Sequence, residues 1–139
     1  LEFVGIDIAK KTADFHLLKA CKAGTITNDP RGVQQLAERL PAPGEVLVVL
    51  ESTGGYELEL YLGLIELGHH VARVNAKRPR DFAKACGRFA KTDRIDAEIL
   101  ARYGETFRPR PTVDESPIRR KIRAFVDRRR QLVQLKCEE

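Results

Sequence analysis

The segment EVLVVLESTGG, residues 45–55, contains the clearest strand in the chain. Residues 46–50 form a continuous apolar run, which is typical of a parallel strand buried on both faces of a sheet. Glu51 follows at the carboxyl end of this strand, and residues 52–55 then turn the chain into a helix. A central parallel strand of this kind predicts an α/β fold.

Further strands and helices are expected on both sides of this strand. The first three strands are spaced for an antiparallel meander. The later strand–helix–strand order implies a right-handed parallel crossover. The predicted fold is therefore a mixed sheet with flanking helices. The expected strands are residues 3–8, 12–19, 24–28 and 71–75, and the expected helices are 31–40, a helix from 58 that Gly68 caps, 79–85 and 92–107.

The segment KTDRIDA, residues 91–97, presents a difficulty for the last of these helices. Asp93 and Asp96 are expected inside the helix, on the stripe that also carries Leu100 and Tyr103 and therefore faces the sheet. Aspartate is a poor residue for a helix interior, and its charge is costly to bury. A bound cation would compensate the charge. Alternatively, Asp93 is an acid in the first turn, where the helix dipole favours it.

Four carboxylates are expected to meet at one point. Asp7 and Glu51 end neighbouring strands, and Asp93 and Asp96 would reach the same point from a helix lying on the sheet. Such a cluster repels itself unless a cation is present. Oxygen ligands without Cys or His favour Mg²⁺ or Mn²⁺, and two ions suit phosphoryl transfer. Alternatively, Glu51 is an acidic residue that starts a helix.

Composition places the chain among globular proteins. Its 139 residues, 42% of them hydrophobic, suffice for one core. The apolar runs are far shorter than a membrane span, and no secretion signal opens the chain. The three cysteines show no paired spacing, which fits a reducing compartment. We therefore expect a cytoplasmic protein without membrane association.

Charge is unevenly distributed. Residues 1–115 hold 17 residues of each sign, whereas residues 116–139 hold 8 basic and 3 acidic residues and so carry the whole net charge of +5. Basic segments beside carboxylates suit a polyanion handled at a metal site, although a solvated charged surface is an equally simple interpretation. The residues expected to bind nucleic-acid phosphates are Lys77, Arg78, Arg80, Lys84, Arg88, Lys91 and Arg94, with Arg73 beside them, and Arg119, Arg120 and Arg123 near the C-terminus.

The chain is predicted to have three parts. Residues 1–108 form the catalytic domain, the proline-containing residues 109–115 form a linker, and residues 116–139 form an extended basic amphipathic helix. That helix repeats apolar residues every seven positions, as a coiled coil does, although an arginine interrupts the repeat. The repeating residues are Ile118, Phe125 and Leu132.

Three motifs occur in a defined order: GIDIAK at residues 5–10, LESTGGY at 50–56 and KTDRIDAEILA at 91–101. Together they resemble the N-terminal DEDD domain of insertion-sequence transposases, a family that includes the pilin-gene-inverting DNA invertases and is understood as bridge-RNA-guided recombinases. The resemblance covers residues 3–107 and implies an RNase H-like fold of the Holliday-junction-resolvase type. It places the metal-binding and catalytic tetrad on Asp7, Glu51, Asp93 and Asp96.

The resemblance also implies a function. The chain would be the metal-dependent catalytic domain of a transposase or site-specific recombinase that cleaves and rejoins DNA under the guidance of an RNA. A nucleophilic serine would come from a downstream domain, to which the helix of residues 116–139 would connect as a coiled coil. The enzyme would work as a dimer or tetramer.

Two other interpretations stay open. One is a non-catalytic module of the same fold that binds nucleic acid or dimerises. The other is a sugar-kinase or actin-like phosphotransferase, but these proteins place a glycine-rich phosphate loop where this chain has IAKKT, residues 8–12.

Overall fold

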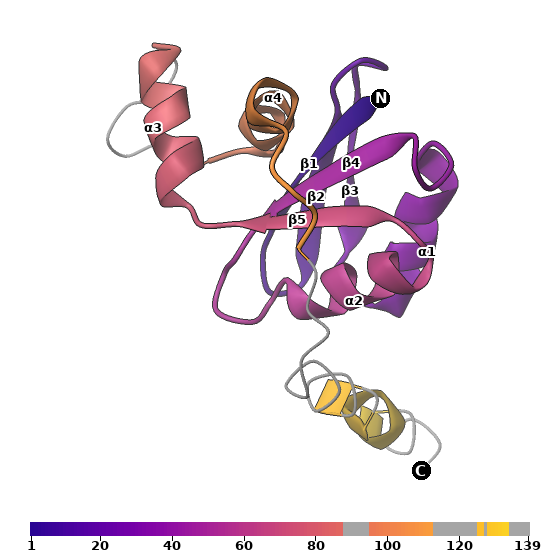
Figure 1. Cartoon of the computed structure of the whole chain (residues 1–139). Helices are drawn as coiled ribbons and strands as arrows, with labels where there is room; N and C mark the ends of the chain where they lie inside the picture. The colour runs from indigo at the N-terminus through magenta and orange to yellow at the C-terminus, as the bar shows by residue number, and fades with distance from the viewer. Residues whose placement is uncertain (88–94, 113–124, 127, 134–139) are drawn as a thin grey trace.

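The computed structural model describes residues 1–87, 95–112, 125–126 and 128–133. Strands and helices alternate along most of this length (Figure 1), which confirms the predicted α/β class. In chain order the elements are β1 (Glu2–Ile8), β2 (Thr12–Leu17), β3 (Lys22–Thr27), α1 (Pro30–Arg39), β4 (Val46–Glu51), α2 (Leu58–Glu66), β5 (His70–Val74), α3 (Lys77–Ala85) and α4 (Ala97–Phe107).

The five strands form one mixed sheet in the order β3-β2-β1-β4-β5 (Figure 1). β1 is antiparallel to β2, and β2 is antiparallel to β3, as the predicted meander requires. β1 and β5 both run parallel to β4, which lies between them. A three-stranded meander joined through its first strand to two parallel strands is the RNase H-like arrangement that the resemblance implied.

The apolar run of β4 explains its central position. Every side chain of residues 46–50 is buried, and the residues alternate between two cores. Val48 and Leu50 pack with α1 and α2 on one face, whereas Leu47 and Val49 pack with α4 on the other. Burying one such side chain stabilises the fold by about 1.5–3 kcal/mol, so this strand holds both layers together.

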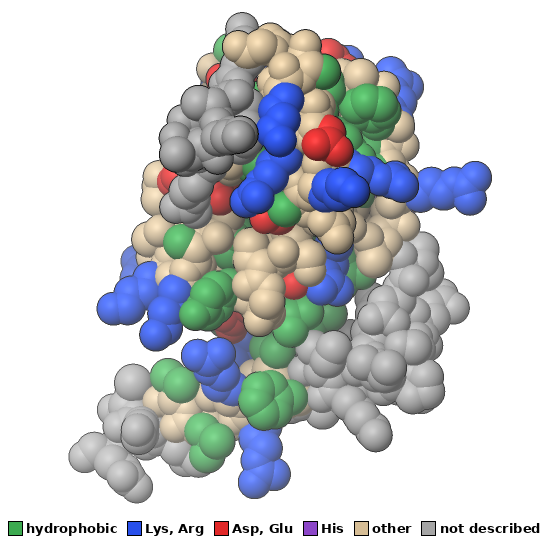
Figure 2. Space-filling view, turned by 90° about the vertical axis from the view of Figure 1, so that its left-hand side faces the viewer, with side chains coloured by type: hydrophobic (Ala, Val, Ile, Leu, Met, Phe, Trp, Pro, Cys, Tyr) green, Lys and Arg blue, Asp and Glu red, His purple; other side chains and the backbone are tan. Residues whose placement is uncertain are grey.

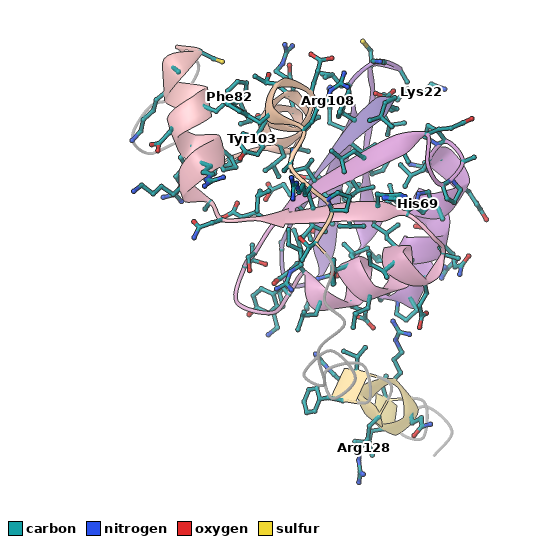
Figure 3. All side chains as sticks on the ribbon, viewed as in Figure 1. Lys22, His69, Phe82, Tyr103, Arg108 and Arg128 are labelled. Carbon is teal, nitrogen blue, oxygen red and sulfur yellow. The ribbon has the colours of Figure 1, made fainter. Side chains whose placement is uncertain are left out.

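α3 is attached to the body through α4 and stands outside it in Figure 1. The ring of Phe82 in α3 meets Tyr103 and Phe107 of α4 edge-on, with centroids 6.0 and 5.7 Å apart. Figure 3 shows Phe82 and Tyr103 pointing towards each other between the two helices. This aromatic contact fixes where the exposed face of α3 lies.

Two segments differ from the sequence-based expectation. α4 begins at Ala97 rather than at residue 92, and α3 begins two residues before the predicted start at residue 79. Residues 109–112, within the predicted linker, run along the outer edge of β5. The backbone N–H of Thr112 donates to the carbonyl of Val71 at 2.9 Å, and Thr112 Oγ1 accepts from the N–H of Arg73 at 2.9 Å.

Part of the predicted C-terminal helix is described. Residues 125–126 and 128–133 are helical, and Arg130 Nε donates to Glu59 Oε1 at 3.1 Å. Phe125 and Leu132 of the predicted seven-residue repeat are exposed here. The rest of that helix lies outside the described residues. No helix in the described parts of the chain is long and apolar enough to cross a membrane.

Candidate functional site

Asp7 and Glu51 lie side by side at the carboxyl ends of two parallel strands. The register pairs Ile6 of β1 with Leu50 of β4, so the two acidic residues follow at the same level. Adjacent strands are about 4.8 Å apart. Because Ile6 and Leu50 point to the α1–α2 core, both carboxylates lie on the opposite face, which α4 covers. The sheet therefore brings two of the four predicted residues together, both half-buried.

Asp14 of β2 is a further acidic neighbour of this pair. It stands directly opposite Asp7 in the antiparallel register, and its carboxylate accepts a 2.7 Å hydrogen bond from Thr25 Oγ1. Like charges directly opposite each other destabilise a sheet. The residue types alone do not reveal this neighbour, although the short connection between the two strands could have suggested the register.

Asp96 lies just before α4, not inside it, so the expectation of a buried helix-interior aspartate is wrong for this residue. Its backbone is extended, with φ −94° and ψ 173°, and its side chain is exposed. Asp96 Oδ1 accepts a 2.8 Å hydrogen bond from the N–H of Ile99. This is the N-cap position, where aspartate is among the most favoured residues. The other carboxylate oxygen of Asp96 is not used by the cap.

A glycine contact sets the start of α4 beside Asp7. A Cβ at Gly5 would lie 1.9 Å from the carbonyl oxygen of Ala97, so only glycine lets the helix approach β1 this closely. Further along α4, Gly104 lies against Phe3 and Val49, so the helix runs back towards the beginning of β1. The start of α4, with Asp96 and the positive end of the helix dipole, is therefore directed towards the strand end that carries Asp7.

These carboxylates fit a hard divalent cation by donor type. They are oxygen donors, half-buried or exposed at one end of the sheet, and Asp7 faces the negative charge of Asp14, which a cation would offset. Within residues 1–87, 95–112, 125–126 and 128–133, no three His, Cys, Asp or Glu side chains are grouped closely enough to hold a metal ion. Asp93, the fourth predicted ligand, lies outside these residues.

Glu57 is a buried charge that the sequence pattern does not reveal. Only 1% of its surface is exposed, and it lies at the entry to α2, directly after the loop that follows Glu51. Its carboxylate accepts from the backbone N–H groups of Thr53 and Gly55, each at 3.1 Å, and from the hydroxyls of Thr53 and Ser52 at 3.1 and 3.3 Å. One side chain thus holds the whole turn after Glu51.

The electrostatics of Glu57 follow from these bonds. Burial alone would raise the pKa of this carboxyl, but the backbone hydrogen bonds and Arg73 outweigh it and lower the pKa below the ordinary value of 4.5. Arg73 Nη2 donates to Glu57 Oε1 at 2.9 Å, and the guanidinium of Arg73 lies 5.1 Å from the ring centre of Tyr61. The guanidinium of Arg73 is thus held by Glu57 inside the fold, and its place in the phosphate track stays a prediction.

The other described residues of the predicted phosphate track lie on α3. Lys77, Arg78, Arg80 and Lys84 are all exposed, with a single acid, Asp81, among them. Figure 2 shows Lys and Arg side chains gathered on the face of the molecule that carries this helix. The other predicted basic residues lie outside the described part of the chain; they are Arg88, Lys91, Arg94, Arg119, Arg120 and Arg123.

The chain is similar to known proteins. The family model of the DEDD transposase domain, described as a transposase, matches residues 4–138. The chain is 34% identical over 113 residues to the pilin gene-inverting protein of Moraxella bovis, and it is 34% identical over 113 residues to that of Moraxella lacunata. Each match covers 77% of this chain but 35% of the relative, so the chain spans about a third of the length of these curated relatives.

Proposed function

Because the chain belongs to the DEDD transposase family, we propose that it is the metal-binding catalytic domain of a DNA transposase or recombinase. The observation that carries this proposal is the position of Asp7 and Glu51 at adjacent strand ends, with α4 starting from Asp96 beside them. Asp7, Glu51, Asp93 and Asp96 would hold one or two Mg²⁺ or Mn²⁺ ions. Bound there, the ions would supply the positive charge that phosphoryl transfer requires.

The chain's own contribution is to hold the ligands in place. Asp7 and Glu51 are fixed by the strand ladder, and Asp96 is fixed by its bond to the N–H of Ile99, which leaves its second oxygen for a cation. Glu57 holds the turn that follows Glu51. The backbone around Glu51 is therefore fixed on its N-terminal side by the strand pairing of β4 and on its C-terminal side by the bonds to Glu57. The basic face of α3 would guide DNA phosphates to these carboxylates.

We propose that DNA strand exchange also requires parts of the protein outside this chain. The curated relatives are longer, and their name describes the inversion of a pilin gene. We propose that a region outside the chain supplies the nucleophilic serine. A guide RNA and assembly into a dimer or tetramer belong to the same proposal, supported by the resemblance of the three motifs.

Calorimetric titration of the chain with Mn²⁺, repeated in the presence of a short DNA duplex, tests the metal site. We expect binding by the unaltered chain and loss of that binding in Asp7→Asn and in Glu51→Gln, because each variant removes a charged oxygen ligand. Glu38→Gln is the matched control, because Glu38 is an exposed acid on α1, across the sheet. Unchanged Mn²⁺ binding in both Asp7→Asn and Glu51→Gln would refute the metal site.

A melting experiment without metal shows that any loss of binding is local. Asp7→Asn removes the repulsion from Asp14, so we expect the variant to be more stable than the parent by about 0.2–1 kcal/mol in metal-free buffer. A variant that melts well below the parent would have lost binding through misfolding, and Glu51→Gln would then decide the assignment.

A further inference from the structure

A cavity of about 450 Å³ lies at the outer edge of the sheet, between the end of β5 and the start of α3. Its walls come from three segments that are separate in sequence: the end of β5 with the first turn of α3, the middle of α4, and the chain that leaves α4. Four of its lining residues are cations, namely Arg73, Lys77, Arg78 and Arg110, and Asn75 and Tyr103 belong to the same wall.

Most of the positive charge of this cavity has no counter-charge in the part of the chain that the structure describes. Among the residues that the structure describes, no Asp or Glu lines it. Arg73 is neutralised by Glu57. The three other cations, Lys77, Arg78 and Arg110, are exposed, and none of them forms an ion pair with a described residue. Three cations that line one cavity repel each other, and an anion bound between them would offset that repulsion.

The start of α3 adds to this excess of positive charge. Lys77 and Arg78 occupy its first turn, where the helix dipole favours acids and disfavours cations. Ala76 at the N-cap has no side-chain oxygen to offer, and the N–H of Lys77 is bonded instead to Asn75 Oδ1 at 3.0 Å. A departure from the usual helix start, at residues that also line a cationic cavity, is typical of a binding site.

The cavity adjoins the carboxylate site. Val74, which lines it, is the register partner of Glu51, and its carbonyl accepts from the N–H of Ser52 at 3.1 Å. An anion in the cavity would therefore lie one strand away from Glu51. A nucleic-acid backbone places phosphates at regular intervals, so one phosphate can occupy the cavity while another reaches the carboxylates.

We propose that Lys77, Arg78 and Arg110 bind a backbone phosphate of the DNA on which the carboxylate site acts. This inference rests on the proposed function and adds a site to it. Arg110 is outside the basic residues that the sequence pattern selected, because it follows α4 and joins the others only through the fold. The contact is with phosphate, so it sets the position of the DNA and is insensitive to its sequence.

The test measures binding of a fluorescein-labelled DNA duplex to the chain over a range of salt concentrations. We expect the double variant Arg78→Gln/Arg110→Gln to weaken binding and to reduce the slope of log K against log salt by about 0.9 for each phosphate that the variant no longer neutralises. The matched control is Lys22→Gln/Arg31→Gln, which removes the same charge from exposed residues of β3 and α1. Lys22 lies far from α3 in Figure 3. The control should keep the parental slope.

Three results would overturn the proposal: no binding of DNA by the parent chain, equal slopes in the two double variants, or a slope change with RNA of the same sequence and none with DNA. Thermal melting of both variants checks that they are folded. Mn²⁺ titration of the same samples separates this proposal from the proposed function. A slope change without any Mn²⁺ binding would support phosphate binding in the cavity and refute the metal site. Mn²⁺ binding without a slope change would support the metal site and refute phosphate binding in the cavity.

Discussion

Glu57 illustrates how much of the site depends on one residue that does not touch it. The turn after Glu51 contains Gly54 and Gly55 at positive φ, 72° and 116°, which other residues rarely adopt. A turn of two such residues has little stiffness of its own. The buried carboxylate supplies the stiffness by accepting bonds from both ends of the turn, and Arg73 neutralises its charge.

Replacing Glu57 by Gln tests this role. The amide keeps the shape of the side chain but loses its charge, and we expect the unfolding free energy to fall by about 2 kcal/mol, since hydrogen bonds to charged groups contribute about 1.5–3 kcal/mol. Glu59→Gln is the control, because its ion pair with Arg130 is partly exposed and should contribute about 1 kcal/mol or less. Equal losses in urea denaturation of the two variants would contradict the assignment.

The stability difference between the parent and Glu57→Gln should depend on pH. The folded-state pKa of Glu57 is lowered, so its stabilising effect is complete above the ordinary pKa of 4.5 and is lost as the pH falls through the folded-state value. The difference in unfolding free energy between the parent and Glu57→Gln should thus be constant above about pH 5 and shrink on acidification. A difference that grows in acid would show that the carboxyl is protonated in the fold.

At the start of α4, the residue that the periodicity predicts to lie in the core is a capping residue. Asp96, Leu100, Tyr103 and Phe107 recur at helical spacing, and that stripe extends backwards without a visible break. The periodicity therefore predicts a longer helix. An aspartate that bonds the N–H three residues ahead ends the helix instead, because the cap satisfies a backbone group that would otherwise lack a partner.

Substitutions at Asp96 separate its capping role from the proposed metal role. Asn caps a helix as well as Asp does, so Asp96→Asn should keep the stability of the parent, whereas Asp96→Ala should lose about 1 kcal/mol. Only the metal role requires the negative charge, so Asp96→Asn should still weaken Mn²⁺ binding in calorimetry.

Asp29 provides the comparison for that experiment. It caps α1 through a 2.8 Å bond from the N–H of Gly32, on the other face of the sheet. Asp29→Asn should change neither stability nor Mn²⁺ binding. If Asp96→Asn also leaves Mn²⁺ binding unchanged, Asp96 serves α4 alone.

Across the fold, the sequence predicts the sheet well and the contacts between separate segments poorly. The strands are visible because their apolar runs and turns are local, and Asp7 and Glu51 are visible because they end such runs. Glu57 and Arg73 meet only across the fold, so neither periodicity nor spacing reveals their pairing. Arg110 reaches its cavity for the same reason. The metal-binding roles of all four carboxylates, Asp7, Glu51, Asp93 and Asp96, stay predictions.

Residues 109–112, here called the strap, lie along the edge of β5 and bear on where the domain ends. The strap bonds the edge of β5, and the carbonyl of Thr112 accepts from the hydroxyl of Tyr61 at 3.0 Å. A fragment of residues 1–108 would leave that edge without partners, and bare edges promote association. We expect it to aggregate more than a fragment of residues 1–112 in light scattering. Equal behaviour of the two fragments would mean that the strap is dispensable.

The close approach of β1 and α4 at Gly5 determines which residues of the interior can be exchanged. The atoms that meet there are those of the main chain, on the strand and on the first turn of α4. Exchanging one core side chain for another of similar volume alters the packing around them but not this spacing. The protein can therefore accept much variation in its apolar residues while the gap between Asp7 and Asp96 stays constant, provided that position 5 keeps no side chain at all.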